Sequence, residues 1–431
     1  MSLGFDEHFS VAGKSRLLTG AASCEGAGAA PHFAPHERRI LCVDMDAFFA
    51  SIEQQCAPGE WEGRPVMVCG NTEERSAVAA ANYVAREYGV TAGTPITTAR
   101  RRCPHGIFIE GDPQKYVFAC VRINDICREF TPRVETFSID ESFLDVTGSA
   151  HLFGGPVALG RKLKARIREE LGIPSTVGIG PNKLLAKTAS KLGKPDGLRV
   201  LTPDQVPTVL HPLPVDQLYG IGAQTARKLR LLGVATVGDL ARLPREVLRR
   251  MFGIIGPMLH DAAQGIDPSP LLTDREQPEA KSVGNSHTLA RDTRSVRKVL
   301  TVLLGLCSKV GRRLRQGGHA GRTLTLAVRF ASYQTVVRAR TVEAPINLDR
   351  DIFEAACDLL DELWPRHRRV RLLGVSVANL VHGDAPRQLA LFRSDYRRRY
   401  RQALESVDQL RDRYGENAVL WGSLVRHGQA I

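Results

Sequence analysis

The first two hundred residues alternate between short apolar runs, which predict buried strands, and stretches with helical spacing. Residues 39–46 form an apolar run that predicts a strand ending in carboxylates, and a helix follows it. Residues 135–146 form a second strand-like run that also holds adjacent acids. Residues 175–180 predict a third strand, and 181–192 predict a helix with Asn182 at its capping position. The pattern indicates an α+β fold.

The second half of the chain changes pattern twice. Residues 203–266 hold short helices separated by glycines, which predicts a small helical domain, and 267–280, rich in Pro and charge, predict a linker. Residues 281–381 follow the order strand, helix, strand, strand, helix, strand, the ferredoxin-like βαββαβ motif. A Gly-, Ala- and Ser-rich flexible extension over 1–37 and a tail over 382–431, with an Arg-rich amphipathic helix, flank these domains. We therefore expect a multidomain protein.

Composition narrows the class of protein. The chain has 431 residues, of which 43% are hydrophobic and 24% are charged, enough apolar sequence for several buried cores. Its 9 cysteines include no C-x-x-C pair, which favours reduced core residues of a cytoplasmic protein. No run approaches the ~20 apolar residues of a membrane span. We expect neither a disulfide-built secreted protein nor a membrane protein.

The distribution of charge favours a polyanionic partner. The chain carries 59 Lys and Arg against 46 Asp and Glu, a net charge of +13. Residues 281–381 alone hold 18 Lys and Arg against 8 Asp and Glu. A basic domain of this kind is typical of nucleic-acid binding, and a solvated basic surface is the alternative that charge alone leaves open.

Two pairs of acids lie on the predicted strands. Asp44 and Asp46 are two residues apart, so both side chains leave the same face of a sheet. Asp140 and Glu141 lie in the second run, and the two pairs converge if the strands are neighbours. Because a straight strand would point Asp140 and Glu141 to opposite faces, a bend is required there. Clustered carboxylates suit Mg²⁺, and surface or capping acids are the alternative that either pair alone leaves open.

Five motifs occur in a fixed order along the chain. They are VDMDAFFASIE at 43–53, ANYVAR at 81–86, SIDESFLD at 138–145, VGIGPNKLLAK at 177–187 and LYGIG at 218–222. Together they closely resemble the motifs of the Y-family DNA polymerases, and most closely those of the bacterial polymerase IV branch. The resemblance continues in unbroken order from residue 38 to 425.

The resemblance implies a right-hand polymerase that copies a DNA template with low fidelity past damaged bases. Its domains would be a palm, fingers, a helix-hairpin-helix thumb and a βαββαβ little finger. These would occupy 38–47 with 112–202, 48–111, 203–266 and 281–381 respectively. Since no second set of acids remains outside the palm, we expect no proofreading exonuclease.

The resemblance also assigns catalytic residues. Asp44, Asp140 and Glu141 would hold two Mg²⁺ ions, with the carbonyl of Met45 contributing to the nucleotide-side ion. Two ions roughly 3.5–4 Å apart would activate a primer 3′-hydroxyl and stabilise the leaving pyrophosphate. The resemblance leaves Asp46 less certain as a ligand.

The incoming dNTP would meet four further residues. Phe49 matches the ring that clashes with a ribose 2′-hydroxyl, although without the family context it would be assigned to the core. Tyr83 and Arg86, three residues apart on a helix, and Lys187 match the triphosphate ligands. Ala80 stands where relatives carry a Ser or Thr that bonds the triphosphate, so that contact is missing or replaced. Spacing alone would let Lys183 and Lys187 both face a phosphate.

Primer–template DNA is the expected macromolecular partner. Gly220 and Gly222 precede a helix, as in hairpins whose N–H groups approach a DNA phosphate, although an ordinary glycine turn has the same residues. Arg329 and Arg338, on what we expect to be the inner pair of strands of the little finger, are the favoured backbone contacts of a set that also holds Arg322 and Arg340.

A short apolar peptide follows the little finger. Gln388, Leu389, Leu391 and Phe392 match the motif by which bacterial polymerases bind the sliding clamp, the β subunit. The same residues would also suit a packed strand. We expect the polymerase itself to be a monomer.

Three other functions are weighed against this one. An ATPase is excluded because G-x-x-x-x-G-K-[ST] is absent. A non-catalytic DNA-bound recruitment subunit of the same fold would have lost the metal carboxylates, which are present here. A palm-type nucleotide cyclase would leave the basic domain and the clamp-like peptide without a purpose.

Overall fold

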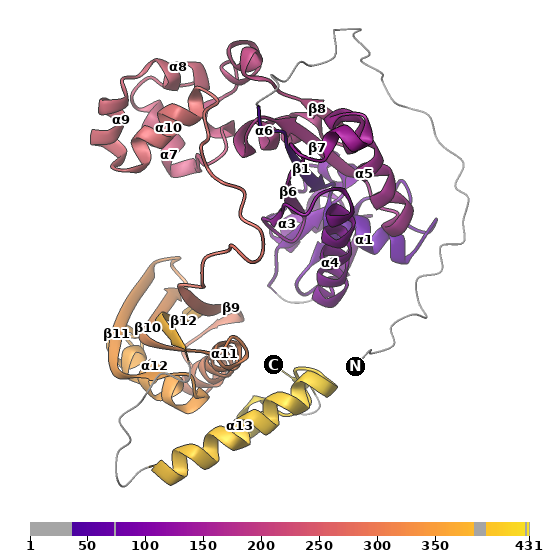
Figure 1. Cartoon of the computed structure of the whole chain (residues 1–431). Coiled ribbons are helices and arrows are strands. Elements are labelled where there is room, and N and C mark those ends of the chain that lie inside the picture. The colour runs from indigo at the N-terminus through magenta and orange to yellow at the C-terminus, as the bar shows by residue number, and fades with distance from the viewer. Residues whose placement is uncertain (1–36, 73–74, 383–393, 427–428, 431) are drawn as a thin grey trace.

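The computed structural model describes residues 37–72, 75–382, 394–426 and 429–430. Figure 1 shows a large α/β body at the start of the chain, a cluster of short helices, and a separate four-stranded sheet with its own helices. The extension over 1–37, apart from its last residue, lies outside the described residues.

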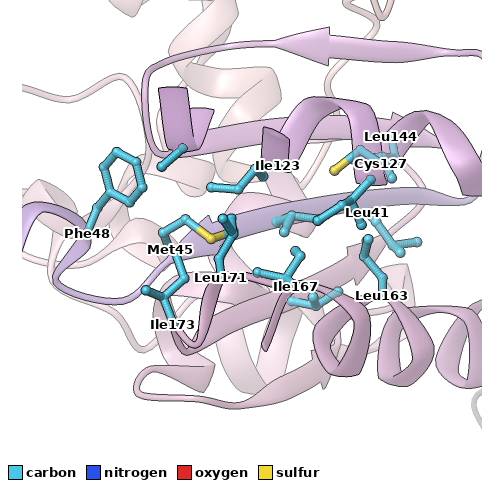
Figure 2. Packing of buried hydrophobic residues seen from close by; sticks show 14 of the residues in the cluster. Leu41, Met45, Phe48, Ile123, Cys127, Leu144, Leu163, Ile167, Leu171 and Ile173 are labelled. Carbon is cyan, nitrogen blue, oxygen red and sulfur yellow. The ribbon is translucent and has the colours of Figure 1, made fainter. Parts of the chain in front are cut away.

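A five-stranded sheet, in the order β5-β6-β1-β7-β8, forms the centre of the first body. Its strands are β1 (Ile40–Met45), β5 (Val134–Thr136), β6 (Glu141–Asp145), β7 (Ser175–Gly180) and β8 (Leu198–Val200). One face is covered by α1 (Phe48–Cys56), α4 (Pro113–Phe130) and α5 (Pro156–Leu171). Figure 2 shows this apolar layer, in which β1, α4 and α5 contribute Leu41, Met45, Ile123, Leu163, Ile167 and Leu171.

The period of two along β1 decides what each face of this sheet carries. Leu41, Val43 and Met45 point into the apolar cluster with α4 and α5. Ile40 and Cys42 point to the other face, where they pack with Phe143 of β6 and with α6 (Lys183–Gly193). Asp44 continues this second series, so the carboxylate faces α6.

A second, three-stranded sheet lies within the range expected for the fingers. Its order is β3-β2-β4, from β2 (Val66–Cys69), β3 (Val78–Ala81) and β4 (Ile107–Glu110), with the short helices α2 (Tyr83–Glu87) and α3 (Ile96–Arg102). It has its own small apolar cluster around Met67 and Ala85. The buried side chains of α1 belong instead to the cluster of the large sheet.

Short helices form the next body along the chain, as the glycine spacing predicts. They are α7 (Ala223–Arg230), α8 (Val237–Arg242), α9 (Arg245–Phe252) and α10 (Ile255–Ala263). Their apolar cluster includes Leu184, Leu185 and Ala189 of α6. One helix therefore packs on the large sheet and on the helical body at once.

The segment expected to be a linker packs partly on the large sheet. Leu271 is 1% exposed and packs with Ile40, Cys42 and Phe143. The backbone N–H of Leu272 donates to the carboxylate of Glu135 at 2.8 Å. The first half of this connection is therefore fixed along the sheet.

The basic domain has the predicted βαββαβ order. Its elements are β9 (Ser282–Thr293), α11 (Val296–Gln316), β10 (His319–Phe330), β11 (Thr335–Ile346), α12 (Asp349–Leu363) and β12 (Val370–His382). The strand order is β11-β10-β12-β9, so β10 and β12 are the inner strands and β11 is an edge. The expectation that β10 and β11 form the inner pair is wrong. Both helices cover the face that carries Leu324, Leu326 and Val328.

Helix α13 (Ser394–Tyr414) follows this domain and is joined to α11 by ion pairs. Arg315 of α11 donates to Asp408 of α13 at 2.7 Å and to Asp349 at 2.8 Å, and Arg312 donates to Asp412 at 2.6 Å. The predicted Arg-rich helix is confirmed, and it is part of the folded structure. In the described ranges, no helix has the length and apolar character that crossing a membrane requires.

Candidate active site

The register of three antiparallel strands brings the predicted carboxylates together. Asp44 lies directly opposite Glu141 across the β1–β6 pair and opposite Thr176 across the β1–β7 pair. Cross-strand partners share a face of the sheet, so the two carboxylates are neighbours. Asp44 is 6% exposed and Glu141 is 7% exposed. The expected convergence is confirmed for Asp44 and Glu141, one acid from each pair.

The run over 135–146 is a hairpin rather than a single strand. β5 ends at Thr136, the chain bends through Ser138 and Asp140, and β6 begins at Glu141. The backbone carbonyl of Asp140 accepts from the N–H of Met45 at 2.9 Å, so Asp140 extends the pairing with β1. The required bend is confirmed. In this structure the Asp140 carboxylate accepts a hydrogen bond from the Ser138 hydroxyl at 2.7 Å.

Helix α6 brings Lys187 to these carboxylates. A Cβ at Gly178 of β7 would lie 2.0 Å from the carbonyl oxygen of Ala186, so only glycine lets α6 approach the sheet this closely. Lys187 Nζ lies 2.9 Å from Asp44 Oδ2 and also bonds Glu141. Gly178 therefore has a packing role. This role agrees with the absence of a phosphate-loop pattern from the sequence.

Burial and charge shape the protonation of this pair. Burial raises the pKa of Glu141 above its ordinary value, against the lowering effect of Lys187. Burial lowers the pKa of Lys187, but the surrounding acids outweigh it and the net shift is upward. Burial also raises the pKa of the Cys42 thiol, which donates to Glu141 at 3.4 Å. Lys187 therefore stays charged beside its carboxylates.

Lys183 does not share the position of Lys187. Its Nζ lies 3.1 Å from both carboxylate oxygens of Glu135, and it faces the ring of Phe143. The interpretation that both lysines face one phosphate is therefore wrong for this structure. Lys183 instead fixes the Glu135 carboxylate that also holds the linker at Leu272.

A second lysine, which the sequence did not single out, lies at the carboxylates. Lys194 Nζ is 2.5 Å from Asp44 Oδ1, 3.5 Å from the carbonyl oxygen of Met45 and 3.8 Å from Asp46 Oδ1. Lys194 is 150 positions from Asp44 and just beyond α6, so no local pattern identifies the contact.

Asp46 is an anchor rather than an open ligand. It is fully buried and accepts hydrogen bonds from the Thr176 hydroxyl at 2.9 Å, the Tyr83 hydroxyl at 3.1 Å and the backbone N–H of Asp196 at 2.8 Å. These contacts join β1 to β7, to helix α2 and to the loop after α6. Burial, then the charge of Asp46, raises the pKa of Tyr83.

The donor set fits a hard divalent cation in its chemistry. Asp44, Asp140 and Glu141 supply carboxylate oxygens and Met45 supplies a carbonyl, the ligands that Mg²⁺ prefers. The ammonium groups of Lys187 and Lys194 already contact the oxygens of Asp44, Glu141 and Met45. In the described part of the chain, no three acids, histidines or cysteines are arranged to hold a metal as they stand. Asp140 would have to turn from Ser138 to complete the set.

The predicted nucleotide-side residues lie around the start of α1 and α2. The Phe49 ring, half-buried, stacks on Tyr116 of α4. The guanidinium of Arg86 lies 4.5 Å from the centre of the Tyr83 ring, so the predicted common side of α2 is confirmed. Arg86 also donates to the carbonyl of Ala81 at 3.0 Å. Ala80 is on β3, next to this group.

The predicted DNA contacts lie on two other bodies. Gly220 has φ +91°, and Gly222 is the N-cap residue of α7. Arg329 of β10 lies on the sheet face away from the helices. Arg338 of β11 lies opposite Leu326, hence on the helix side, with its side chain exposed at the edge of the sheet. Arg340 is engaged by Asp358 and Glu362 of α12.

The clamp-motif residues lie outside the described residues. Gln388, Leu389, Leu391 and Phe392 fall between the end of β12 at His382 and the start of α13 at Ser394.

Family models match most of the chain. The impB/mucB/samB family matches residues 43–191, the DNA polymerase-iota thumb domain matches 216–267, and the impB/mucB/samB family C-terminal domain matches 280–391. These matches follow the large sheet, the helical body and the basic domain.

Similar proteins span nearly the same length. DNA polymerase IV of Moorella thermoacetica is 43% identical over 382 residues, which cover 88% of this chain and 94% of that protein. DNA polymerase IV of Pelotomaculum thermopropionicum is 41% identical with the same coverage. The solved Y-family DNA polymerase chimera Dbh-Dpo4(243-245)-Dbh has a TM-score of 0.71 at 30% identity, covering 80% of this chain and 99% of that one. The insertion ternary complex of Dbh DNA polymerase has a TM-score of 0.55 at 30% identity, with the same coverage.

Proposed function

This chain belongs to the Y-family DNA polymerases, in their polymerase IV group, and we infer that it adds deoxynucleotides to a primer along a DNA template with low fidelity, as a translesion enzyme. The observation that carries this function is the register that sets Asp44 opposite Glu141, with Asp140 at the adjoining bend. A recruitment subunit would not need these acids. A nucleotide cyclase would not need the thumb-like and basic domains.

Polymerases of this family depend on metal ions, and we propose two Mg²⁺ ions here. Asp44, Asp140 and Glu141 would hold one, and Asp44 with the carbonyl of Met45 would hold the other. When bound, the ions would activate the primer 3′-hydroxyl and stabilise the leaving pyrophosphate. Asp140 would turn from Ser138 to reach them. Because Asp44 and Glu141 are already adjacent, little of the chain has to move.

The nucleotide would lie between α1, α2 and α6. Arg86 offers a planar set of donors for phosphate oxygens, and the hydroxyl of Tyr83 is held in place by Asp46. Lys187 would leave its carboxylates for the triphosphate when the metal arrives, so its charge stays balanced in both states. Phe49 would lie against the sugar and exclude a 2′-hydroxyl. Since Ala80 has no hydroxyl, Tyr83 and Arg86 would carry more of the triphosphate contact.

The DNA would be held by the thumb and the little finger. Gly220 and Gly222 at the start of α7 would let backbone N–H groups approach a phosphate. The open face of the little-finger sheet carries small side chains, among them Thr325 and Ala327 of β10, which leaves room for a DNA backbone. Arg329 on that face and Arg338 at the β11 edge would neutralise phosphates without reading sequence.

The remaining partner and the cellular site follow from the same function. We propose that Gln388, Leu389, Leu391 and Phe392 bind the bacterial sliding clamp and that the polymerase is otherwise a monomer. Since its substrate is primer–template DNA, we propose that it works in the cytoplasm. We also propose that the palm comprises residues 38–47 and 112–202, the fingers 48–111, the thumb 203–266 and the little finger 281–381.

Primer extension on an undamaged template with dNTPs and Mg²⁺ tests the function. We expect extension that EDTA stops, no shortening of the primer, and extension past an abasic site in a second template. An Asp44→Asn variant is the control for contaminating polymerases. Binding of primer–template without any extension, in Mg²⁺ or Mn²⁺, would favour the recruitment subunit instead.

A further inference from the structure

The tip of the β10–β11 hairpin carries an exposed tyrosine in an unfavourable backbone conformation. Tyr333 has φ +63°, in the left-handed region that favours glycine and asparagine, and it is 67% exposed. This conformation destabilises a turn that holds a tyrosine, and an exposed ring gains little stability from burial. Strain without a gain in packing indicates a functional position.

Arg368, just before β12, holds this turn in shape. Its Nη2 donates to Ser332 Oγ at 3.1 Å and to Gln334 Oε1 at 2.8 Å, the residues on either side of Tyr333. Its guanidinium also lies 3.7 Å from the centre of the Phe330 ring, a cation–π contact. The turn is therefore fixed on both sides of the exposed ring.

Arg371 of β12 holds the ring itself and connects it to another domain. Its guanidinium lies 4.3 Å from the centre of the Tyr333 ring, and its Nη1 lies 3.7 Å from Asp292 Oδ1 near the end of β9. Asp292 Oδ1 lies 2.5 Å from Nη1 of Arg75, which belongs to the proposed fingers. Three residues lie in register at this end of the sheet, on β10, β12 and β9 in turn: Phe330, Val370 and Thr293. The Tyr333 ring therefore lies where the proposed little finger meets the proposed fingers.

This end of the sheet has an excess of positive charge. Arg368 contacts uncharged groups, and Arg369 is exposed beside it. Arg371 shares the carboxylate of Asp292 with Arg75. An exposed ring among arginines suits single-stranded DNA, because the ring stacks on a base and the guanidinium groups neutralise phosphates. A duplex suits the ring less, since its bases are already stacked on each other.

We propose that Tyr333 stacks on an unpaired base of the template strand ahead of the primer end, with Arg369 at an adjoining phosphate. The inference rests on the proposed function, in which the templating base lies opposite the incoming nucleotide beside the fingers, and the duplex lies on the little finger. The uncopied strand then leaves near the junction of these two domains, where the ring lies. Stacking holds this strand without reading its sequence, because every base has a flat face.

Binding of two DNA substrates tests the proposal without catalysis. Fluorescence anisotropy is measured with a primer–template that has an unpaired template overhang and with a blunt duplex of the same paired sequence. Tyr333→Gly should bind the overhang substrate about five-fold more weakly than the wild type, equivalent to ~1 kcal/mol, and the blunt duplex equally well. Tyr414→Ala is the matched control, because Tyr414 on α13 is 64% exposed and has the Arg413 guanidinium 5.2 Å from its ring centre.

Glycine at this position separates stacking from folding. Since glycine adopts a positive φ without strain, Tyr333→Gly should have a melting midpoint close to that of the wild type. Tyr333→Phe keeps the ring and should keep the affinity for the overhang. The stacking role is overturned by a marked fall in the melting midpoint of Tyr333→Gly, by an equal loss of affinity for both substrates, or by a Tyr333→Phe variant as weak as Tyr333→Gly.

A fluorescent adenine analogue in the overhang gives a direct readout, because stacking quenches its emission. The analogue should be quenched in the wild-type complex and brighter in the Tyr333→Gly complex, and equal emission in both would contradict stacking. Extension of the same primer separates this inference from the function on which it rests. If the wild type extends the primer while Tyr333→Gly binds both substrates as the wild type does, only the stacking role fails. If the wild type extends no primer, the proposed function fails and the template role fails with it.

Discussion

The ring of Phe49 lies nearly parallel to that of Tyr116, with centroids 4.1 Å apart and planes inclined by 16°. Tyr116 is itself fixed, because its hydroxyl donates to the buried carboxylate of Glu53 at 2.8 Å. A stacked pair of this kind holds a ring in one orientation. The proposed sugar gate therefore has rigid support behind it, which a gate based on steric exclusion requires.

Replacing Phe49 with alanine should let ribonucleotides in. The variant removes the ring but leaves the carboxylates and the phosphate-side residues, so we expect selectivity for deoxy- over ribonucleotides to fall by about 10- to 200-fold. Single-turnover incorporation of both nucleotides measures the ratio. Phe48→Leu is the control, since Phe48 is 3% exposed and packs in the core. An unchanged ratio in Phe49→Ala would assign Phe49 to the core as well.

Removing the carboxylates should abolish extension. We expect Asp44→Asn and Asp140→Asn each to slow it by about 10²–10³-fold or more, the loss seen when a charge-stabilising group is removed, while primer–template binding stays near normal. Single-turnover extension and DNA-binding titrations measure the two effects. Ser138→Ala is the control for Asp140, because it removes only the hydrogen bond to that carboxylate and should retain activity. Rapid extension by either Asn variant would contradict the two-metal assignment.

Local patterns predicted the elements of the site well. Residues 175–180 form β7 as expected, and the Asn182 side chain caps α6 by accepting from the N–H of Leu185 at 2.9 Å. Apolar runs, caps and glycine stops are properties of a few neighbouring residues, so a sequence reveals them. The bend before Glu141 was also predictable, because a straight strand would point Asp140 and Glu141 to opposite faces of the sheet.

Partners that are distant in sequence were not predictable in the same way. The contacts of Lys194 with Asp44 and of Tyr116 with Phe49 join elements that only the folded chain brings together. Strand order is likewise a tertiary property, which is why β11 was expected inside the little-finger sheet and lies at its edge. The two lysines likewise pair with acids that are distant in sequence. Lys183 pairs with Glu135, whereas Lys187 pairs with Asp44, and the spacing of the lysines on the helix could not reveal this difference.

Two arginines of the little finger should contribute to the salt dependence of DNA binding. We expect Arg329→Ala and Arg338→Ala each to reduce the slope of log affinity against log salt by about 1, the effect of one lost phosphate contact. Fluorescence titrations with primer–template at several salt concentrations measure the slope. Arg340→Ala is the matched control on β11, because Asp358 and Glu362 already neutralise Arg340. Equal slopes in all variants would move the DNA grip to another surface.

Helix α13 should stabilise the little finger through a buried ion network. Arg315, 9% exposed, lies between Asp349 and Asp408, so Asp408→Ala leaves a buried guanidinium with one of its two carboxylate partners. Breaking a buried pair costs about 3–5 kcal/mol, so the midpoint of thermal unfolding should fall clearly. Asp412→Ala is the comparison, since Asp412 is 56% exposed and should have a small effect. Similar midpoints for both variants would show that the network contributes little.

Replacing Leu391 and Phe392 with alanine should remove stimulation by the sliding clamp. The motif is far in sequence from every proposed catalytic residue, so basal extension on a short primer should be unchanged. Binding to a ring that encircles DNA would raise the local concentration of the polymerase at the primer end, an avidity effect rather than a new catalytic contact. Extension with and without the bacterial clamp measures the stimulation.

The competing interpretation, in which these residues pack as a strand, makes a different prediction for the same variant. It requires a lower melting temperature and lower basal activity, because two apolar side chains would leave a core. Apolar anchors dominate peptide interfaces, so the docking role also predicts that Gln388→Ala loses less stimulation than the double variant. Equal stimulation of wild type and double variant, or a marked loss of thermal stability, would count against docking. Asp408→Ala supplies the reference for a stability loss in this domain, since its effect on the clamp response should follow only from unfolding.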